Sequence, residues 1–118
     1  MKILITGAEG LLGSNLCLMY SKDNEVYATD RNIPNIIGCI NYKMDITNKE
    51  DIKLIKKIRP ELIIHCAALV NIDYCEDHPD EARKVNVFGS KNIAEIAKES
   101  SSYLIHISTD AVFDGEKG

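Results

Sequence analysis

The sequence of 118 residues has no apolar run long enough to cross a membrane and no secretory signal peptide at its start. A membrane-spanning helix needs ~20 consecutive apolar residues. Basic residues are not in excess either, because the formal net charge at pH 7 is -4. We therefore expect a globular domain that binds neither membranes nor nucleic acid.

No two of the four cysteines form a Cys-x-x-Cys pair. Two of them lie in apolar stretches, where a free thiol behaves as a small hydrophobe, which favours a reducing cytoplasm. His65-Cys66 is followed by Cys75 and His78, but structural zinc pairs are usually closer together. We therefore interpret His65 and Cys66 as a buried strand end and predict no metal site.

A glycine-rich turn opens the chain. An apolar run ends at Thr6, and Gly7, Gly10 and Gly13 follow at the spacing Gly-x-x-Gly-x-x-Gly before a helical pattern begins. Gly7 permits a tight turn, Gly10 lets the backbone approach a pyrophosphate, and Gly13 lets the helix pack close to the strand. The free N–H groups of the helix N-terminus favour an anion. The turn therefore predicts a dinucleotide site.

Apolar runs that alternate with helical patterns predict five strands, at residues 2–6, 25–29, 40–44, 62–66 and 103–107. Strands separated by helices imply parallel pairing with right-handed crossovers. We expect a Rossmann-like, doubly wound α/β sheet in the order 3-2-1-4-5, which makes residues 1–118 one incomplete NAD(P)-binding domain. Ligands of such sheets bind outside the carboxyl ends of the strands.

Three helices are predicted between these strands. The inward faces are assigned by spacing: Leu12, Leu16, Met19 and Tyr20 in the first, Ile52, Ile55 and Ile58 in the second, and Ala82, Val85, Ile93, Ile96 and Ala97 in the third. Residues 47–50 form a capping box for the second helix, which ends at Arg59-Pro60. The third helix starts near Pro79, and Gly89 within it indicates close packing against a neighbour.

Acidic residues at the ends of two strands favour nucleotide binding. Asp30 lies about 20 residues after the glycine turn, where a carboxylate accepts the ribose hydroxyls of NAD. Arg31 leaves NADP open, because a guanidinium can bind a 2′-phosphate, with a surface charge as the alternative. Asp45 and Ile46 are predicted to bracket the adenine, with a structural loop aspartate as the alternative. The small residues in Cys66-Ala67-Ala68 would let the cofactor approach the backbone or would serve a tight turn.

Four motifs occur in order, at residues 6–13, 65–68, 85–92 and 107–115. Together they resemble the extended short-chain dehydrogenase/reductase family. The last motif, Ile107-Ser108-Thr109-Asp110-Ala111-Val112-Phe113-Asp114-Gly115, is most similar to the dTDP-4-dehydrorhamnose reductase branch. The resemblance covers nearly the whole chain.

The resemblance implies roles for individual residues. Thr109 matches the catalytic Ser/Thr, whose hydroxyl helps to polarise a keto group as hydride arrives. Ser108 would line the nicotinamide pocket, and Asn86 matches a helix asparagine that supports the site or fixes the helix to nearby backbone. The expected cofactor contacts are Gly7, Glu9, Gly10, Leu11, Leu12, Gly13, Asp30, Arg31, Asp45, Ile46, Cys66, Ala67, Ala68, Asn86 and Ser108.

Two departures from the family pattern stand out. Ala111 replaces a tyrosine that is usual in the reductase branch, and no tyrosine of the chain is followed four residues later by lysine. In the family's Tyr-x-x-x-Lys pair the tyrosine is the general acid and the lysine lowers its pKa. That pair and the sugar-binding region would lie beyond Gly118.

The resemblance implies the nucleotide-binding part of a reductase that moves hydride from NAD(P)H to the 4-keto group of a deoxysugar nucleotide. By itself this part should bind cofactor without turnover. The alternatives are a regulatory subunit similar to the β subunit of methionine adenosyltransferase, or a sugar-nucleotide epimerase or dehydratase. An unpaired last strand, at residues 103–107, would favour self-association.

Overall fold

Five parallel strands form one sheet in the computed structural model, which describes residues 1–66, 79–80 and 84–107. Their order is β3-β2-β1-β4-β5, as the sequence predicts. Each strand end lies within one residue of its predicted position: β1 is Lys2–Thr6, β2 is Glu25–Asp30, β3 is Ile40–Lys43, β4 is Leu62–His65 and β5 is Tyr103–His106. Thr6 pairs with Thr29 and with His65, so the central strands end at one edge.

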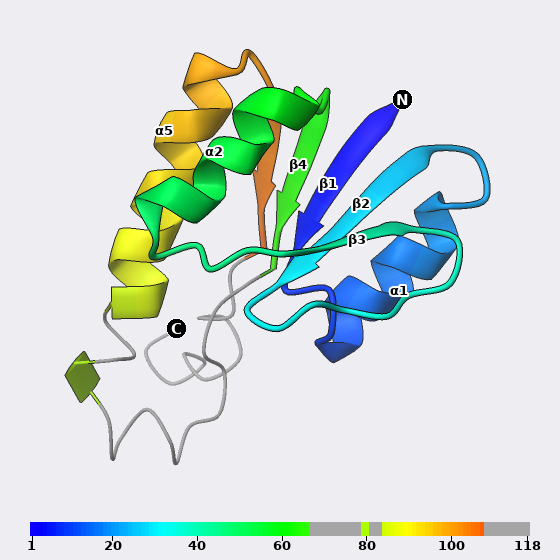
Figure 1. The fold of residues 1–118 in the computed structure, drawn as a ribbon, viewed down its shortest axis with the longest axis horizontal. Coiled ribbons are helices and arrows are strands. Elements are labelled where there is room, and N and C mark those ends of the chain that lie inside the picture. Colours follow the sequence, from blue (N-terminus) through cyan, green and yellow to red (C-terminus); the bar gives the residue numbers. More distant parts are fainter. Residues whose placement is uncertain (67–78, 81–83, 108–118) are drawn as a thin grey trace, which may run out of the picture.

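Helices cover both faces of the sheet. Helix α1 (Leu11–Tyr20) lies on one side, and α2 (Lys49–Ile58) and α5 (Ser90–Glu99) lie on the other (Figure 1). A π-helical segment, η1 (Lys84–Gly89), leads directly into α5. The arrangement is a Rossmann-like, doubly wound α/β fold. None of the described helices is long and apolar enough to span a membrane.

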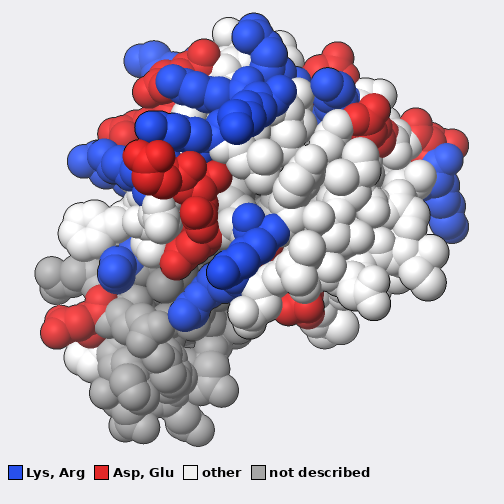
Figure 2. Space-filling model, in the orientation of Figure 1, with Lys and Arg blue, Asp and Glu red and all other residues white. Residues whose placement is uncertain are grey.

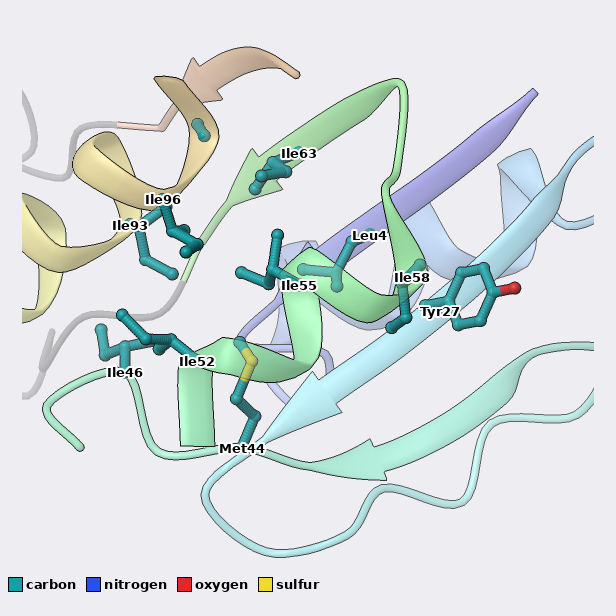
Figure 3. Packing of buried hydrophobic residues seen from close by; sticks show 11 residues of the cluster. Leu4, Tyr27, Met44, Ile46, Ile52, Ile55, Ile58, Ile63, Ile93 and Ile96 are labelled. Carbon is teal, nitrogen blue, oxygen red and sulfur yellow. The ribbon is translucent and has the colours of Figure 1, made fainter. Parts of the chain in front are cut away.

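Alternation along β1 divides the buried side chains between two core layers. Ile3 and Ile5 pack towards α1, whereas Leu4 belongs to the layer under α2 and α5, which Figure 3 shows. All three are at most 1% exposed, and each such side chain contributes about 1.5–3 kcal/mol when fully buried. The central strand is thus buried on both faces, as is usual for a parallel sheet with helices on both sides.

Helix α1 turns a different face to the sheet from the one predicted. Leu16 and Tyr20 pack partly against the core, but Leu12 and Met19 are 45% and 53% exposed. Gly13 is at the centre of the buried face instead. Its lack of a side chain lets the helix approach the preceding turn. Residues 11–21 carry no charge that would mark the outward face in the sequence.

The start of α2 is one residue later than the predicted capping box. Asn48 is the N-cap, and its side chain accepts hydrogen bonds from the N–H groups of Glu50 and Asp51. Thr47 instead donates its hydroxyl and its N–H to the Asp45 carboxylate, at 2.7 Å and 2.9 Å. Thr47 is therefore hydrogen-bonded to the Asp45 carboxylate and does not cap the helix.

The body and end of α2 agree with the sequence prediction. Ile52, Ile55 and Ile58 are buried. Arg59 follows the helix in the left-handed region, with φ 54°, and Pro60 comes next. Proline cannot continue the helix, so the chain turns there into β4.

The third predicted helix is only partly regular. Pro79 and Asp80 are helical, and Ile93, Ile96 and Ala97 are buried in α5 as predicted. Ala82 and the Val85 side chain lie outside what the structure describes. The π-helical segment η1 was not predicted from the sequence.

Gly89 ends η1 against the core. A Cβ at this position would lie 2.5 Å from Cδ1 of Ile46, a distance that real contacts do not reach. The predicted close packing of Gly89 against a neighbouring element is therefore confirmed.

Charge is unevenly distributed over the surface. On the face in Figure 2, charged side chains gather over α2 and α5, where the Lys56 ammonium lies 2.9 Å from the Glu99 carboxylate. The residue stretches 11–21 and 32–42 carry no charge, and they meet where the Cys39 thiol lies 3.7 Å from the Cys17 carbonyl oxygen.

Cys17, Cys39 and Cys66 are free thiols. Burial, with the nearby Cys39 thiol, raises the pKa of Cys17 to about 12.

Candidate functional site

The glycine turn is built by backbone contacts at the carboxyl end of β1. Gly7 has φ 69°, which favours glycine, and its carbonyl oxygen accepts the Gly10 N–H at 3.0 Å. A Cβ on Gly13 would lie 2.1 Å from that same oxygen. Gly7 and Gly13 thus have the turn and packing roles that the spacing predicts.

Gly10 begins α1 without a side chain. It is the N-cap of the helix and, as a glycine, supplies no side-chain cap to the first N–H groups, which are the groups that favour an anion at a helix N-terminus. A Cβ on Gly10 would lie 3.4 Å from the Gly7 carbonyl oxygen, which is ordinary contact. The fold therefore tolerates a side chain here, although a phosphate held against the backbone would not. Leu11 and Leu12, the first residues of α1, are exposed beside it.

Asp30 connects the end of β2 to the glycine turn. One carboxylate oxygen accepts the Glu9 N–H at 2.9 Å, and the other accepts the Arg31 N–H at 2.7 Å. An ionised carboxylate has about four lone-pair sites, so it retains acceptor capacity for ribose hydroxyls. Asp30 therefore orders the turn at the position where the sequence predicts a ribose contact.

Asp45 lies at the next position along the same edge. Although partial burial opposes ionisation, the Thr47 hydrogen bonds and the charges of Arg31 and Lys84 hold the pKa of Asp45 below its usual range. Its own N–H donates to the Asp51 carboxylate at 3.0 Å. The site therefore has a stably ionised carboxylate with two cations near it. Lys84 was not singled out from the sequence, and no motif there identifies it.

Ile46 belongs to the core rather than to the open edge. Its side chain is 4% exposed and packs in the layer under α2 and α5, and its carbonyl oxygen accepts the Asn92 side-chain N–H at 3.0 Å. An adenine contact from Ile46 would have to involve its backbone N–H. Asn92 was missed by sequence reasoning, although it precedes buried Ile96 by one helical turn.

The end of β4 is held by side-chain hydrogen bonds. His65 is 1% exposed and contacts the Thr6 hydroxyl and the Ser90 hydroxyl with its two ring nitrogens. The half-buried Cys66 donates its N–H to the Thr6 hydroxyl at 2.9 Å. The prediction of a buried strand end is confirmed for His65, whereas Cys66 follows the strand and is half-buried. The part of the chain that the structure describes holds no group of three or more potential metal ligands.

The remaining predicted residues differ in how far the structure places them. Asn86 is exposed in η1, before the start of α5. Ala67, Ala68, Ser108 and Thr109 lie outside the described residues. The structure therefore brings the glycine turn, Asp30 and Asp45 to one edge of the sheet and leaves the catalytic position a prediction.

A protein-family model described as the RmlD substrate binding domain matches residues 1–118. The chain is 37% identical over 119 residues to a dTDP-4-dehydrorhamnose reductase of Aggregatibacter actinomycetemcomitans, a match that covers 98% of this chain and 37% of that protein. It is 35% identical over 122 residues to the bovine methionine adenosyltransferase 2 subunit beta, covering 97% of this chain and 34% of that protein.

Solved structures give a similar result. A hypothetical dTDP-4-dehydrorhamnose reductase from Sulfolobus tokodaii superposes with a TM-score of 0.86 at 42% identity, over 100% of this chain and 42% of that one. A dTDP-4-dehydrorhamnose reductase from Bacillus anthracis, in complex with NADP, gives 0.81 at 33% identity, over 98% and 38%. The chain thus spans well under half the length of these relatives.

Proposed function

Because this chain belongs to the family described as the RmlD substrate binding domain, we propose that it is the nucleotide-binding part of a sugar-nucleotide reductase. A protein of the relatives' length would transfer hydride from NAD(P)H to the 4-keto group of a deoxysugar nucleotide. For the 118 residues themselves we propose cofactor binding without turnover. The reduction also needs a proton donor at the keto oxygen, and the family's Tyr-x-x-x-Lys pair does not occur in this sequence.

The geometry of the glycine turn carries this proposal. Because Gly10 has no side chain, its backbone would be open to a pyrophosphate. Because Gly13 has none, α1 can start immediately behind the turn. The bound cofactor supplies the hydride. The backbone of Gly10, Leu11 and Leu12 would hold its phosphates, and Asp30 the adenosine ribose.

The other predicted contacts would complete the site. We propose that Asp45 accepts from the adenine amino group and that Cys66, Ala67 and Ala68 allow close approach of the cofactor. Ser108 would line the nicotinamide end. Thr109 would donate its hydroxyl to the substrate's keto oxygen, which gains negative charge during hydride transfer.

Cofactor choice depends on Arg31 in this proposal. Asp30 favours NAD, but Arg31 is adjacent to it and exposed, and its charge already acts on Asp45. A guanidinium can pair with a 2′-phosphate in a bidentate way. We expect Arg31→Ala to weaken NADPH binding more than NADH binding, as measured by calorimetric titration of both cofactors. Equal losses for the two would contradict this role.

Gly10→Ala tests the binding site itself. The new methyl group has room in the fold but occupies the space next to the backbone where a phosphate would lie. We expect this variant to remain folded and to lose at most about 1 kcal/mol in free energy of unfolding, because alanine is a poorer N-cap than glycine. Its NAD(P)H affinity should fall at least about tenfold, which corresponds to about 1.4 kcal/mol of binding free energy. Lys53→Ala, on the exposed surface of α2, is the control that should bind like the parent chain. Unchanged affinity in Gly10→Ala would refute the proposed phosphate site.

A regulatory subunit is the second candidate, because the bovine methionine adenosyltransferase 2 subunit beta is nearly as similar to this chain as the reductase is. Both candidates require the same nucleotide site. They differ in whether a longer form of the protein has a Tyr-x-x-x-Lys pair and reduces a 4-keto sugar nucleotide. A longer form that binds NADPH, lacks the pair and shows no reductase activity would favour regulation.

Self-association through β5 is also proposed. Tyr103 and Ile105 are 81% and 47% exposed on this edge strand, which pairs within the described residues only with β4. A strand with an unpaired edge can pair with another chain. We propose that two copies of the 118-residue chain associate there.

A further inference from the structure

One buried side chain joins four segments at the edge of the sheet that carries the proposed site. Nδ1 of His65, at the end of β4, lies 2.7 Å from the Thr6 hydroxyl oxygen of β1. Its Nε2 lies 3.0 Å from the Ser90 hydroxyl oxygen at the start of α5. The His106 ring of β5 packs against it, with ring centroids 4.9 Å apart. His65 is therefore in contact with two other strands and one helix.

The two hydroxyl partners of His65 adjoin different parts of the proposed site. Thr6 immediately precedes Gly7, and its hydroxyl also accepts the Cys66 N–H. Ser90 directly follows η1, the segment that contains Asn86. A displacement of His65 would therefore act on the glycine turn, on the chain after β4 and on the start of α5 together.

The chemistry of the imidazole suits this position. Burial, followed by the charge of His106, lowers the pKa of His65 to about 4, so the ring is neutral at neutral pH. A neutral imidazole has one donor and one acceptor nitrogen, and each hydroxyl partner can take either role. Buried polar groups that are fully paired in this way fix one arrangement of the surrounding segments.

We propose that His65 is a positioning residue, which holds the glycine turn of β1 in register with the start of α5 through its two hydroxyl contacts. It touches neither cofactor nor substrate in this role. Its effect on cofactor affinity depends on the proposed function, but its effect on the turn does not. Among the described residues, His106 packs its ring against that of His65, and it is itself a titratable side chain.

The experiment is amide hydrogen exchange on the chain without cofactor, comparing His65→Leu with Ile64→Val. Ile64 is the preceding buried residue of β4, and its truncation removes packing but no hydrogen bond. We expect His65→Leu to raise exchange at the N–H groups of Gly10 and Cys66 by at least about tenfold beyond its effect on the N–H of Arg59, the C-cap of α2. Ile64→Val should change exchange at all three in proportion to global stability.

A second variant keeps the proposal testable if His65→Leu does not fold. His65→Asn retains a donor and an acceptor close to the Nδ1 position, so it should preserve protection at Cys66 and lose the Ser90 contact. A change in exchange that is uniform across Gly10, Cys66 and Arg59 in both variants would overturn the positioning role.

NADPH titration of the same proteins separates the two proposals. We expect a loss of about tenfold in NADPH affinity for His65→Leu, because binding would then have to order the glycine turn. Unchanged NADPH affinity with altered exchange at Gly10 would overturn the link to binding. If the parent chain bound neither NADPH nor NADH, the proposed function would fail, while the exchange data would still decide the role of His65.

Discussion

Replacing Gly89 by alanine should destabilise the chain because of one neighbouring side chain. The new Cβ would lie 2.5 Å from Cδ1 and 2.7 Å from Cγ1 of Ile46, which is buried. The backbone at Gly89 has φ -63° and ψ -45°, a conformation that alanine adopts readily. The expected penalty is therefore steric and comes from the Ile46 side chain.

The magnitude follows from two opposing effects. Overpacking a core costs about 1–3 kcal/mol, whereas alanine in place of glycine in a helix gains about 1 kcal/mol. We expect Gly89→Ala to lower the free energy of unfolding by about 1 kcal/mol. In an Ile46→Ala background the two close atoms are absent, so the same substitution should stabilise the chain by up to about 1 kcal/mol. The sign of the effect should thus reverse.

A double-mutant cycle measured by urea unfolding, followed by circular dichroism, tests this reasoning. The coupling free energy between positions 46 and 89 should be about 2 kcal/mol, in the range for residues in contact. Ile58→Ala truncates another isoleucine of the same core layer and is the control, in whose background Gly89→Ala should still destabilise. An equal effect of Gly89→Ala in the Ile46→Ala and parent backgrounds would refute the steric explanation.

Three further predictions concern local contacts. Asn48→Ala should lower the free energy of unfolding by about 1 kcal/mol through loss of the N-cap, whereas Asn48→Asp should be nearly neutral, as urea unfolding would show. The pKa of Asp45 is lowered in the folded state, so its contribution to stability is present above the usual carboxyl pKa and is lost as the pH falls through the lowered value. Thr47→Val should therefore reduce stability at neutral pH and have a smaller effect once the pH has fallen below the lowered pKa of Asp45, whereas Thr47→Ser should retain the parent profile; a loss independent of pH would contradict this assignment. Tyr103→Lys should shift sedimentation towards monomer, because lysine on an edge strand blocks pairing; a monomeric parent chain at high concentration would disprove self-association.

The sheet could be predicted because its signals are local and redundant. The β1 run from Lys2 to Thr6 ends at a glycine turn, and each later run is separated from the next by a helical pattern or a loop. Parallel pairing with right-handed crossovers then leaves few possible strand orders. The residues predicted at the carboxyl ends, Asp30 and Asp45, therefore lie on one edge in the structure.

The details that the sequence did not predict depend on competition between tertiary contacts. The inward face of α1 was ambiguous because residues 11–21 contain no charge to mark the outer side, and packing at Gly13 decided it. Thr47 and Asn48 are both good N-caps, and the Asp45 carboxylate decided between them. The approach of Lys84 to Asp45 depends on how the η1 segment is placed, which no local pattern indicates.

The π-helical segment also bears on how this protein tolerates changes in length. A π-turn bonds i to i+5, one residue more than an α-turn, so η1 acts like a single inserted residue within the helix. Deleting one residue within η1 would let an α-turn take its place, because the extra residue of a π-turn is absorbed within about one full turn of the helix. Ser90 would keep its place beside His65. A change of one residue within η1 should therefore leave the packing of α5 as it is and alter only the side chains that η1 itself presents.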